Sequence, residues 1–284
     1  MLKLQPNMRA NVLPGQLRDD KCGISVRLDE NNLDVKAASV AYQSRLFNFE
    51  IGDESYLDPA LIEKLERRRI KLMAGDRIFE IGKHMDSFRK TSPVFMGVAD
   101  NNLLKKINFL SAFGFQIHID MNVPPASVEI LADALDFYLH NPLLRTPIEP
   151  FHSLLKTVAQ TGPKFTLWDT EYEKTAANIY IGDNGTVSLS ARWNNSGLNY
   201  GTLENSWADI ENSNLYKKLS SFAAELFREK SPCIFCRHMD ICGGFLKAID
   251  KDWSCNPWIE TFDMLKNEVK NARAILKNHS GGES

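Results

Sequence analysis

Four cysteines lie close together in the C-terminal part of the sequence, and they constrain the fold more than any other feature. Cys233, Cys236, Cys242 and Cys255 fall within 23 residues, whereas Cys22 stands alone. The first two are separated by two residues, so both sulfurs can face one ion from a single tight turn. Without an export signal in the chain, such a cluster indicates a zinc or iron-sulfur site rather than disulfides. The spacing predicts one metal site but does not choose between zinc and iron.

The loop that carries these cysteines contains further residues suited to a metal site. Gly243 and Gly244 follow the third cysteine, and glycine lets the backbone come close enough to donate N–H groups to a ligand sulfur. His238 lies in the same loop, where it could bind a metal in place of Cys255 or donate to a sulfur. We expect this histidine to be solvated.

The pattern of apolar residues divides the chain into three regions and predicts an α/β protein. Residues 1–90 should form a small α+β unit, with strand patterns at 23–28 and 35–41 and a helical pattern at 58–72. Residues 91–172 alternate helix and strand, which is typical of βαβ units in a parallel sheet. The expected helices there are 101–113 and 124–140, and the expected strands are 114–121 and 164–168.

The third region, residues 173–284, should be a domain built around the cysteines. It opens with two strand patterns, 176–181 and 186–191, joined by Gly182-Asp183-Asn184-Gly185, which is a strong hairpin signal. It closes with a helical pattern over 257–277.

Composition excludes several classes of function. The 284 residues carry a net charge of −2 with a pI near 6.3, which offers nucleic acid no attractive field. No apolar run reaches the ~20 residues of a membrane span, and the first residues lack the apolar segment of a signal peptide. We therefore expect a cytoplasmic protein with no nucleic-acid or membrane partner. No GxGxxG, Walker or GxSxG motif occurs in the sequence.

The cysteine region resembles the SPASM domain at the C-terminus of radical SAM enzymes that mature peptides. The resemblance rests on SPCIFCRHMDICGG with the later Cys255, preceded by NIYIGDNGTVSLSARW and YGTLENSWADIENS, and covers residues 176–258. In that family the domain usually holds two auxiliary 4Fe-4S clusters. The resemblance implies that Cys233, Cys236, Cys242 and Cys255 hold one of them. The cysteines of the other cluster fall on Ser190, Ser206 and Leu246, so the resemblance implies that this second cluster is absent.

The radical SAM part of the resemblance is incomplete. Such enzymes carry C-x3-C-x2-C near the start of a βαβ barrel, whereas only Cys22 precedes Cys233 in this chain. Three thiolates leave an iron open for the SAM amino and carboxylate groups, so no SAM binding is expected here. The middle region resembles the late half of such a barrel and is too short for a complete one.

The resemblance therefore implies a catalytically degenerate, radical-SAM-like accessory protein of ribosomal peptide natural-product maturation. Its fold would be a truncated barrel fragment between an N-terminal α+β unit and a C-terminal SPASM-like domain. Such a protein would bind a precursor peptide, a partner maturation enzyme or both. Region 1–90 would match, in layout, the small winged-helix module that captures leader peptides in these pathways.

Two other classes of function stay open. His118 and Asp120 lie on one face of a predicted strand with the HxD spacing of a non-haem iron site, whose third ligand would be His140 or His152. A plain zinc-stabilised interaction protein would equally use the four cysteines.

Overall fold

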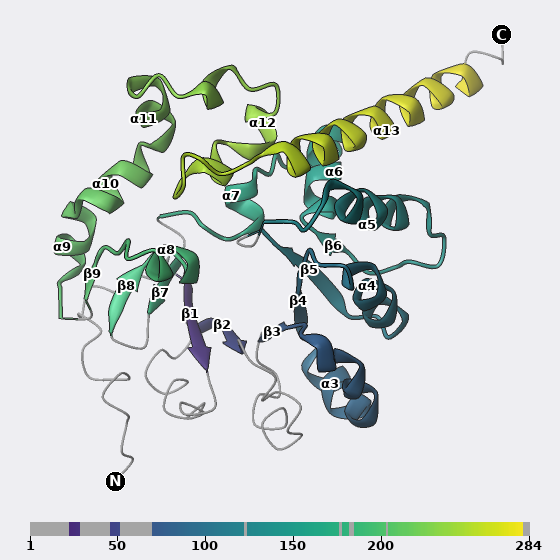
Figure 1. Ribbon diagram of the computed structural model, residues 1–284, viewed down its shortest axis with the longest axis horizontal. Helices are drawn as coiled ribbons and strands as arrows, with labels where there is room; N and C mark the ends of the chain where they lie inside the picture. The colour runs from purple at the N-terminus through teal and green to yellow at the C-terminus, as the bar shows by residue number, and fades with distance from the viewer. Residues whose placement is uncertain are drawn as a thin grey trace. The chain divides into compact units, whose positions relative to one another are not determined.

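The computed structural model describes residues 23–28, 46–51, 70–121, 124–175, 178–181, 185–202 and 204–280. The chain forms two compact units, and each is built from two separate stretches. The first unit comprises Met1–Met96 and Tyr172–Ser231, and the second comprises Gly97–Glu171 and Pro232–Ser284. The chain thus changes units close to both predicted region boundaries, and it changes again after Ser231. Parallel strands combined with helices make this an α/β protein, as the sequence predicts (Figure 1).

A mixed sheet forms the centre of the first unit. Its strand order is β4-β3-β2-β1-β7-β8-β9. The first five strands of this order, β4, β3, β2, β1 and β7, pair in parallel. Strand β8 is antiparallel to β7, and β9 is antiparallel to β8. Only the first three residues of β4 belong to this unit. The strands are β1 Gly23–Leu28, β2 Leu46–Ile51, β3 Ile70–Met73, β4 Val94–Val98, β7 Asn178–Ile181, β8 Thr186–Ser188 and β9 Gly201–Thr202.

Short helices complete the first unit. They are η4 Asp76–His84, α3 Met85–Thr91, α8 Ala191–Asn195, α9 Trp207–Asn212, α10 Asn214–Ser220 and α11 Phe222–Arg228. The expected strand at 23–28 is confirmed, and so is the expected hairpin, by the antiparallel pairs Tyr180↔Ser188 and Ile181↔Val187 of β7 and β8. The expected second strand over 186–191 is wrong at its end, because β8 stops at Ser188 and Ala191 begins α8.

The predicted helix over 58–72 is wrong at its end, because Ile70 and Leu72 lie in strand β3. Both side chains are buried and their neighbours are half-buried, so the burial alternates with the period of a strand. Over only four residues, the apolar pattern of the sequence fits the period of a helix as well as that of a strand. The rest of that predicted helix and the predicted strand at 35–41 lie outside the described residues.

The second unit combines a short parallel strand pair with helices. Strands β5 Gln116–Asp120 and β6 Ile148–Glu149 pair through Ile117↔Ile148 and His118↔Glu149. The helices from its first stretch are α4 Leu103–Ala112, α5 Val128–His140, α6 Phe151–Ala159 and α7 Leu167–Thr170. Those from its second stretch are η5 Pro232–Phe235, α12 Met239–Cys242, η6 Phe245–Lys247 and α13 Asn256–Ser280.

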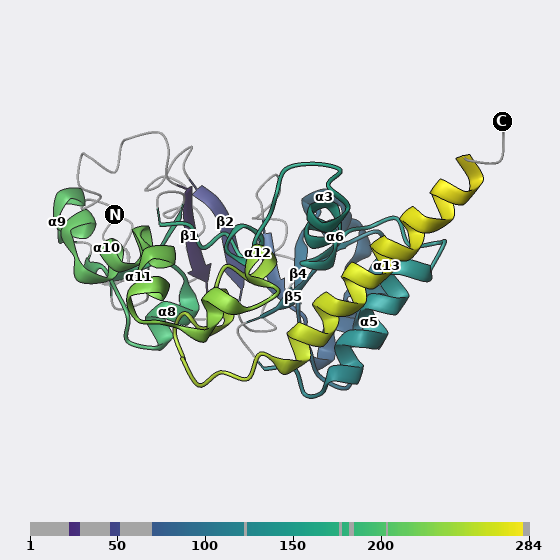
Figure 2. The same ribbon diagram turned by 90° about the horizontal axis from the view of Figure 1, so that it is seen from above.

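Helix α13 joins the two stretches of the second unit. It packs against α5 and α6 and runs alongside α5 in both views (Figures 1 and 2). Its buried stripe is Trp258, Phe262, Leu265 and Val269, which is the spacing of one helical face. The predicted C-terminal helix and the predicted helices matching α4 and α5 are thus confirmed. In the part of the chain that the structure describes, no helix is long and apolar enough to cross a membrane.

The predicted strand at 164–168 is wrong, because the chain enters helix α7 at Leu167. Thr166 and Asp169 form a reciprocal capping box, in which the backbone N–H and the hydroxyl of Thr166 donate to the Asp169 carboxylate at 2.9 and 2.8 Å. The Thr157 hydroxyl accepts from the backbone N–H of Phe165 at 2.8 Å, which fixes the approach to the helix. Local capping therefore outweighs the apolar run, and Trp168 is carried on a helix.

Candidate metal centre

The four clustered cysteines line one cavity of the second unit, which we call the cysteine cavity. It has a volume of about 470 Å³, and Cys233, Cys236, Cys242 and Cys255 all contribute to its wall. They come from η5, the loop after it, α12 and the residue before α13, and none of the four is in a disulfide. The structure thus brings these four side chains to one cavity, while metal binding there stays a prediction. Cys22 lies outside the described residues.

The thiols surround the cysteine cavity without meeting at one point. Among the described residues, no three His, Cys, Asp or Glu side chains are grouped closely enough to hold a metal ion. Apolar side chains complete much of the wall, namely Leu246, Trp253, Ile259 and Phe262.

The environment of Cys242 disfavours the thiolate form of its side chain in the absence of a cation. Burial raises the pKa of its thiol to about 12, and the neighbouring sulfurs of Cys255 and Cys233 act in the same direction. The backbone N–H groups of Leu246 and Gly244 donate toward the sulfur and lower its pKa in part. The predicted approach of glycine backbone to a ligand sulfur is therefore present at Gly244. A cation in the cavity would supply the charge that makes the thiolates stable, with release of their protons.

A tryptophan from the first stretch of the unit holds the cysteine loop in place. Trp168 Nε1 of α7 donates to the backbone oxygen of Gly243 at 2.9 Å, and its ring meets Phe245 edge to face at a centroid distance of 5.2 Å. Gly243 and Gly244 both have left-handed backbone, with φ of 59° and 77°. A Cβ on Gly243 would stand 2.9 Å from Trp168 Cδ1, so glycine is needed here for space as well as for backbone conformation.

Replacing Gly243 with alanine is therefore expected to destabilise the second unit. Left-handed backbone and the contact with Trp168 together should lower the free energy of unfolding by about 1–3 kcal/mol. Urea titration followed by tryptophan fluorescence measures the change. Gly162→Ala is the matched control, since a Cβ at Gly162 meets nothing within 4 Å. Equal stability of the two variants would contradict the assigned role of Gly243.

His238 is buried, so the expectation that it is solvated is wrong. Its exposed fraction is 1%, and it lines the cysteine cavity together with Trp253. Burial lowers the pKa of His238, Lys266 acts in the same direction, and Asp263 opposes both. His238 Nδ1 and Trp253 Nε1 are buried without a hydrogen-bond partner among the residues that the structure describes.

The three positions that the resemblance aligns with the ligands of a second cluster have separate structural environments. Ser190 donates to Glu173 at 2.6 Å, and Ser206 caps α9 through a reciprocal pair with Asp209. Both lie in the first unit. Leu246 lies in the second unit, where it is buried and lines the cysteine cavity. The resemblance further predicts that these three side chains approach one another, as ligands of one cluster would, and this stays a prediction.

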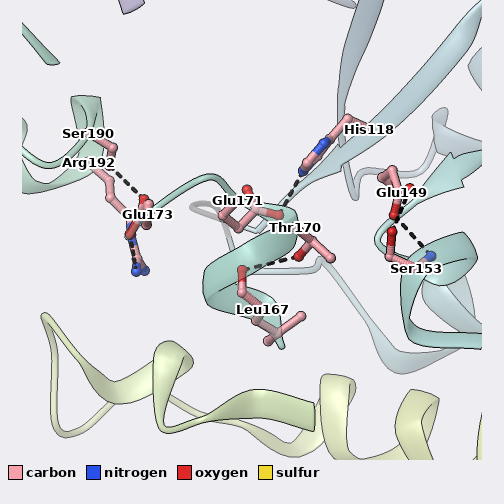
Figure 3. A network of polar contacts seen from close by, with 9 residues as sticks. All are labelled: His118, Glu149, Ser153, Leu167, Thr170, Glu171, Glu173, Ser190 and Arg192. Atoms are coloured by element: carbon pink, nitrogen blue, oxygen red, sulfur yellow. Dashed lines mark hydrogen bonds and ion pairs between the residues drawn. The ribbon is translucent and has the colours of Figure 1, made fainter. Parts of the chain in front are cut away.

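Glu173 gathers a buried polar network that the sequence did not indicate. Its carboxylate accepts from Ser190 and from Arg192 Nε at 2.9 Å (Figure 3). It also accepts from Trp193 Nε1 at 2.8 Å. The Glu173 side chain is only 3% exposed, and that of Arg192 only 12%. Ser190, Arg192 and Trp193 come from the first turn of α8 and the residue that precedes it. The network therefore fixes the start of α8 against the segment that carries Glu173.

The alternative iron site is not assembled in the described residues. His118 Nε2 lies 2.7 Å from Glu171 Oε1, and both side chains are almost fully buried (Figure 3). His152 Nδ1 pairs with the Tyr138 hydroxyl at 2.8 Å, and His140 is exposed and pairs with Asp136 at 2.9 Å. Asp120 is buried at the end of β5, but no group of three ligand side chains forms in the described part of the chain.

Comparison with known proteins does not assign the chain to a family. No protein-family model matches it, and no solved structure matches it. Among curated proteins, the chain is similar to the A subunit of DNA topoisomerase 4 from Rickettsia bellii, at 24% identity over 197 residues. The alignment covers 66% of this chain and 25% of that protein, so the chain spans about a quarter of the relative's length.

Proposed function

We propose that the cysteine cavity holds one 4Fe-4S cluster, with Cys233, Cys236, Cys242 and Cys255 as its ligands. The observation that carries this proposal is that four cysteines from separate elements line one largely apolar cavity. Four thiolates are the ligand set of such a cluster. A zinc ion accepts the same four ligands and is the alternative occupant.

The chemistry of the cavity wall fits a sulfur-rich anionic centre. Two buried nitrogens, on His238 and Trp253, have no hydrogen-bond partner within the described part of the protein, and two backbone N–H groups already point to the sulfur of Cys242. Hydrogen bonds to ligand sulfurs stabilise their negative charge. A bound cluster would supply electron transfer or a cross-link between the elements that carry the cysteines.

The chain as a whole is proposed to be a catalytically degenerate, radical-SAM-like SPASM accessory protein of peptide natural-product maturation. Support comes from the sequence resemblance around the cysteines and from the lack of a C-x3-C-x2-C motif, with Cys22 the sole cysteine before Cys233. Its proposed role is to bind a precursor peptide or a partner maturation enzyme. The α/β arrangement is compatible with a barrel fragment next to a cysteine domain.

Metal analysis of anaerobically purified and reconstituted protein tests the cluster. We expect about four irons and four sulfides per chain, because four cysteines complete the ligand set of one cubane. A measured content of one zinc per chain would contradict the cluster proposal and indicate a structural zinc site instead. A single iron without sulfide, lost on changing His118 or Asp120 to alanine, would favour the non-haem iron alternative.

Incubation with SAM and a strong reductant tests the assignment as a degenerate protein. We expect no 5′-deoxyadenosine above the level of a protein-free control, since the sequence has no three-cysteine motif to leave an iron open for SAM. Co-purification with the products of adjacent genes should recover a peptide or an enzyme. Turnover of SAM by the purified chain would contradict the proposal.

A further inference from the structure

Two buried nitrogen atoms of residues that line the cysteine cavity lack a hydrogen-bond partner in the described part of the chain. His238 Nδ1 and Trp253 Nε1 are both buried and form no hydrogen bond with any described residue. A buried donor without an acceptor is destabilising, so native proteins rarely leave two beside one cavity. The indole N–H can only donate, and the described residues offer it no acceptor.

The hydrogen on the His238 ring can be placed from its neighbours. Arg237 Nε lies 3.1 Å from His238 Nε2 with the geometry of a hydrogen bond. A guanidinium can only donate, so Nε2 accepts and carries no hydrogen. In the neutral ring the hydrogen then resides on Nδ1, the atom for which the described residues offer no partner. Asp263 Oδ1 lies 3.2 Å from Nε2 but forms no hydrogen bond with it, because the Asp263 carboxylate accepts from the Arg237 guanidinium instead.

Helices α13 and α12 hold this imidazole in position. The Phe262 ring packs against it at a centroid distance of 5.5 Å, and Lys266 of α13 donates to the backbone oxygen of Arg237 at 3.0 Å. The backbone N–H of Cys242 donates to the His238 carbonyl at 2.8 Å, which ties the histidine directly to a cysteine of the cavity. The two backbone contacts fix the position of the residue, and a turn of the ring about χ2 would break the contact of Nε2 with Arg237.

We propose that His238 is a positioning residue whose Nδ1–H donates to a sulfur of the metal centre in the cysteine cavity, with Trp253 Nε1 as a second donor. The inference rests on the proposed function for the presence of that centre. An N–H bonded to a ligand or bridging sulfur stabilises the added electron of the reduced cluster. The midpoint potential of the cluster should therefore be higher with these donors than without them.

Three variants test the inference by redox titration of the reconstituted protein. His238→Leu removes the donor, His238→Asn keeps an N–H donor near the place of Nδ1, and Trp253→Phe removes only the indole N–H. His140→Leu is the matched control, because His140 is an exposed histidine of the same unit. We expect a more negative midpoint potential in His238→Leu and Trp253→Phe. The control should keep the wild-type potential, and His238→Asn should stay closer to it than His238→Leu.

The outcomes separate this inference from the cluster proposal. If His238→Leu and Trp253→Phe each bind four irons per chain and keep the wild-type midpoint potential, the cluster proposal is supported and the role of both donors is overturned. If the protein takes one zinc, the cluster proposal fails. The donor role is then supported by a zinc affinity about 10–100-fold lower in His238→Leu but retained in His238→Asn. Wild-type zinc affinity in both His238→Leu and His238→Asn would overturn the donor role. A protein that binds neither iron nor zinc would overturn the metal-centre proposal and the donor role together.

Cobalt substitution decides whether His238 is a donor to sulfur or a ligand itself. Its visible absorption bands distinguish four sulfurs from three sulfurs and one nitrogen. We expect the four-sulfur spectrum in both the wild type and His238→Leu. A nitrogen ligand that disappears in His238→Leu would overturn the donor role, because Nδ1 would then coordinate the metal.

Discussion

Anaerobically reconstituted Cys242→Ser protein is expected to lack the proposed 4Fe-4S cluster. Burial raises the pKa of the thiols of Cys242 and Cys255, and Cys242 is the more buried of the two. A serine hydroxyl at position 242 would ionise even less readily than the Cys242 thiol. Loss of an outer-shell partner costs about 10–100-fold in metal affinity, so loss of a ligand should cost at least about 100-fold. Iron and sulfide analysis after gel filtration, together with the cluster absorption, measures the effect.

Cys22→Ser is the matched control for this experiment. It removes a thiol that the sequence places far from the other four cysteines, and it should keep the full iron content. Serine at Cys233, Cys236 or Cys255 should behave like serine at Cys242, because all four thiols line the same cavity. A Cys255→Ser protein with a full complement of iron would remove Cys255 from the ligand set.

The variant Glu173→Ala is expected to destabilise the first unit strongly. It leaves the Arg192 guanidinium in a site where that side chain is only 12% exposed, and it also strips acceptors from Ser190 and Trp193. Removing one partner of a buried ion pair costs about 3–5 kcal/mol. Denaturant titration by circular dichroism should show the transition at much lower denaturant.

Glu80→Ala is the control in the same unit, because its ion pair with Arg77 is at the surface and should matter little. Glu173→Gln keeps the shape and one acceptor oxygen, so its loss of stability should lie between those of the control and Glu173→Ala. If Glu173→Ala and Glu80→Ala unfold at the same denaturant concentration, the Glu173 network does not stabilise the unit.

Elements with a long or repeated pattern could be predicted from the sequence, whereas short ones could not. Helix α13 carries a sustained apolar stripe that begins at Trp258, and the turn between β7 and β8 ends in Gly185 with φ of 78°, as its composition indicates. Strand β3 and helix α7 are only four residues each, and the apolar pattern predicts the opposite class for both. Pairing with neighbouring strands decides the first case, and the Thr166 cap decides the second.

The candidate site shows the same limit. The spacing of the cysteines indicates that they share one site because ligands close in sequence are close in space. The burial of His238 depends on Phe262 and Asp263 of α13, and Glu173 meets Arg192, which lies 19 positions further along the chain. Such partners are set by tertiary packing, which a single sequence does not encode in any local pattern. The reciprocal Ser206–Asp209 cap of α9 differs, because its three-residue spacing is a local signal that the sequence itself carries.

The two-part construction of the second unit has a consequence for how the protein is made. Residues 97–171 leave the ribosome well before residues 232–284, and the first unit's second stretch is synthesised between them. Trp168 and helices α5 and α6 must therefore wait for the cysteine loop and α13 before they can bury their contact surfaces. During that interval the nascent unit exposes apolar surface, so chaperone binding should concentrate on chains arrested before α13. The proposed cluster could be completed only after synthesis has passed Cys255, so its insertion would be a late step of biogenesis.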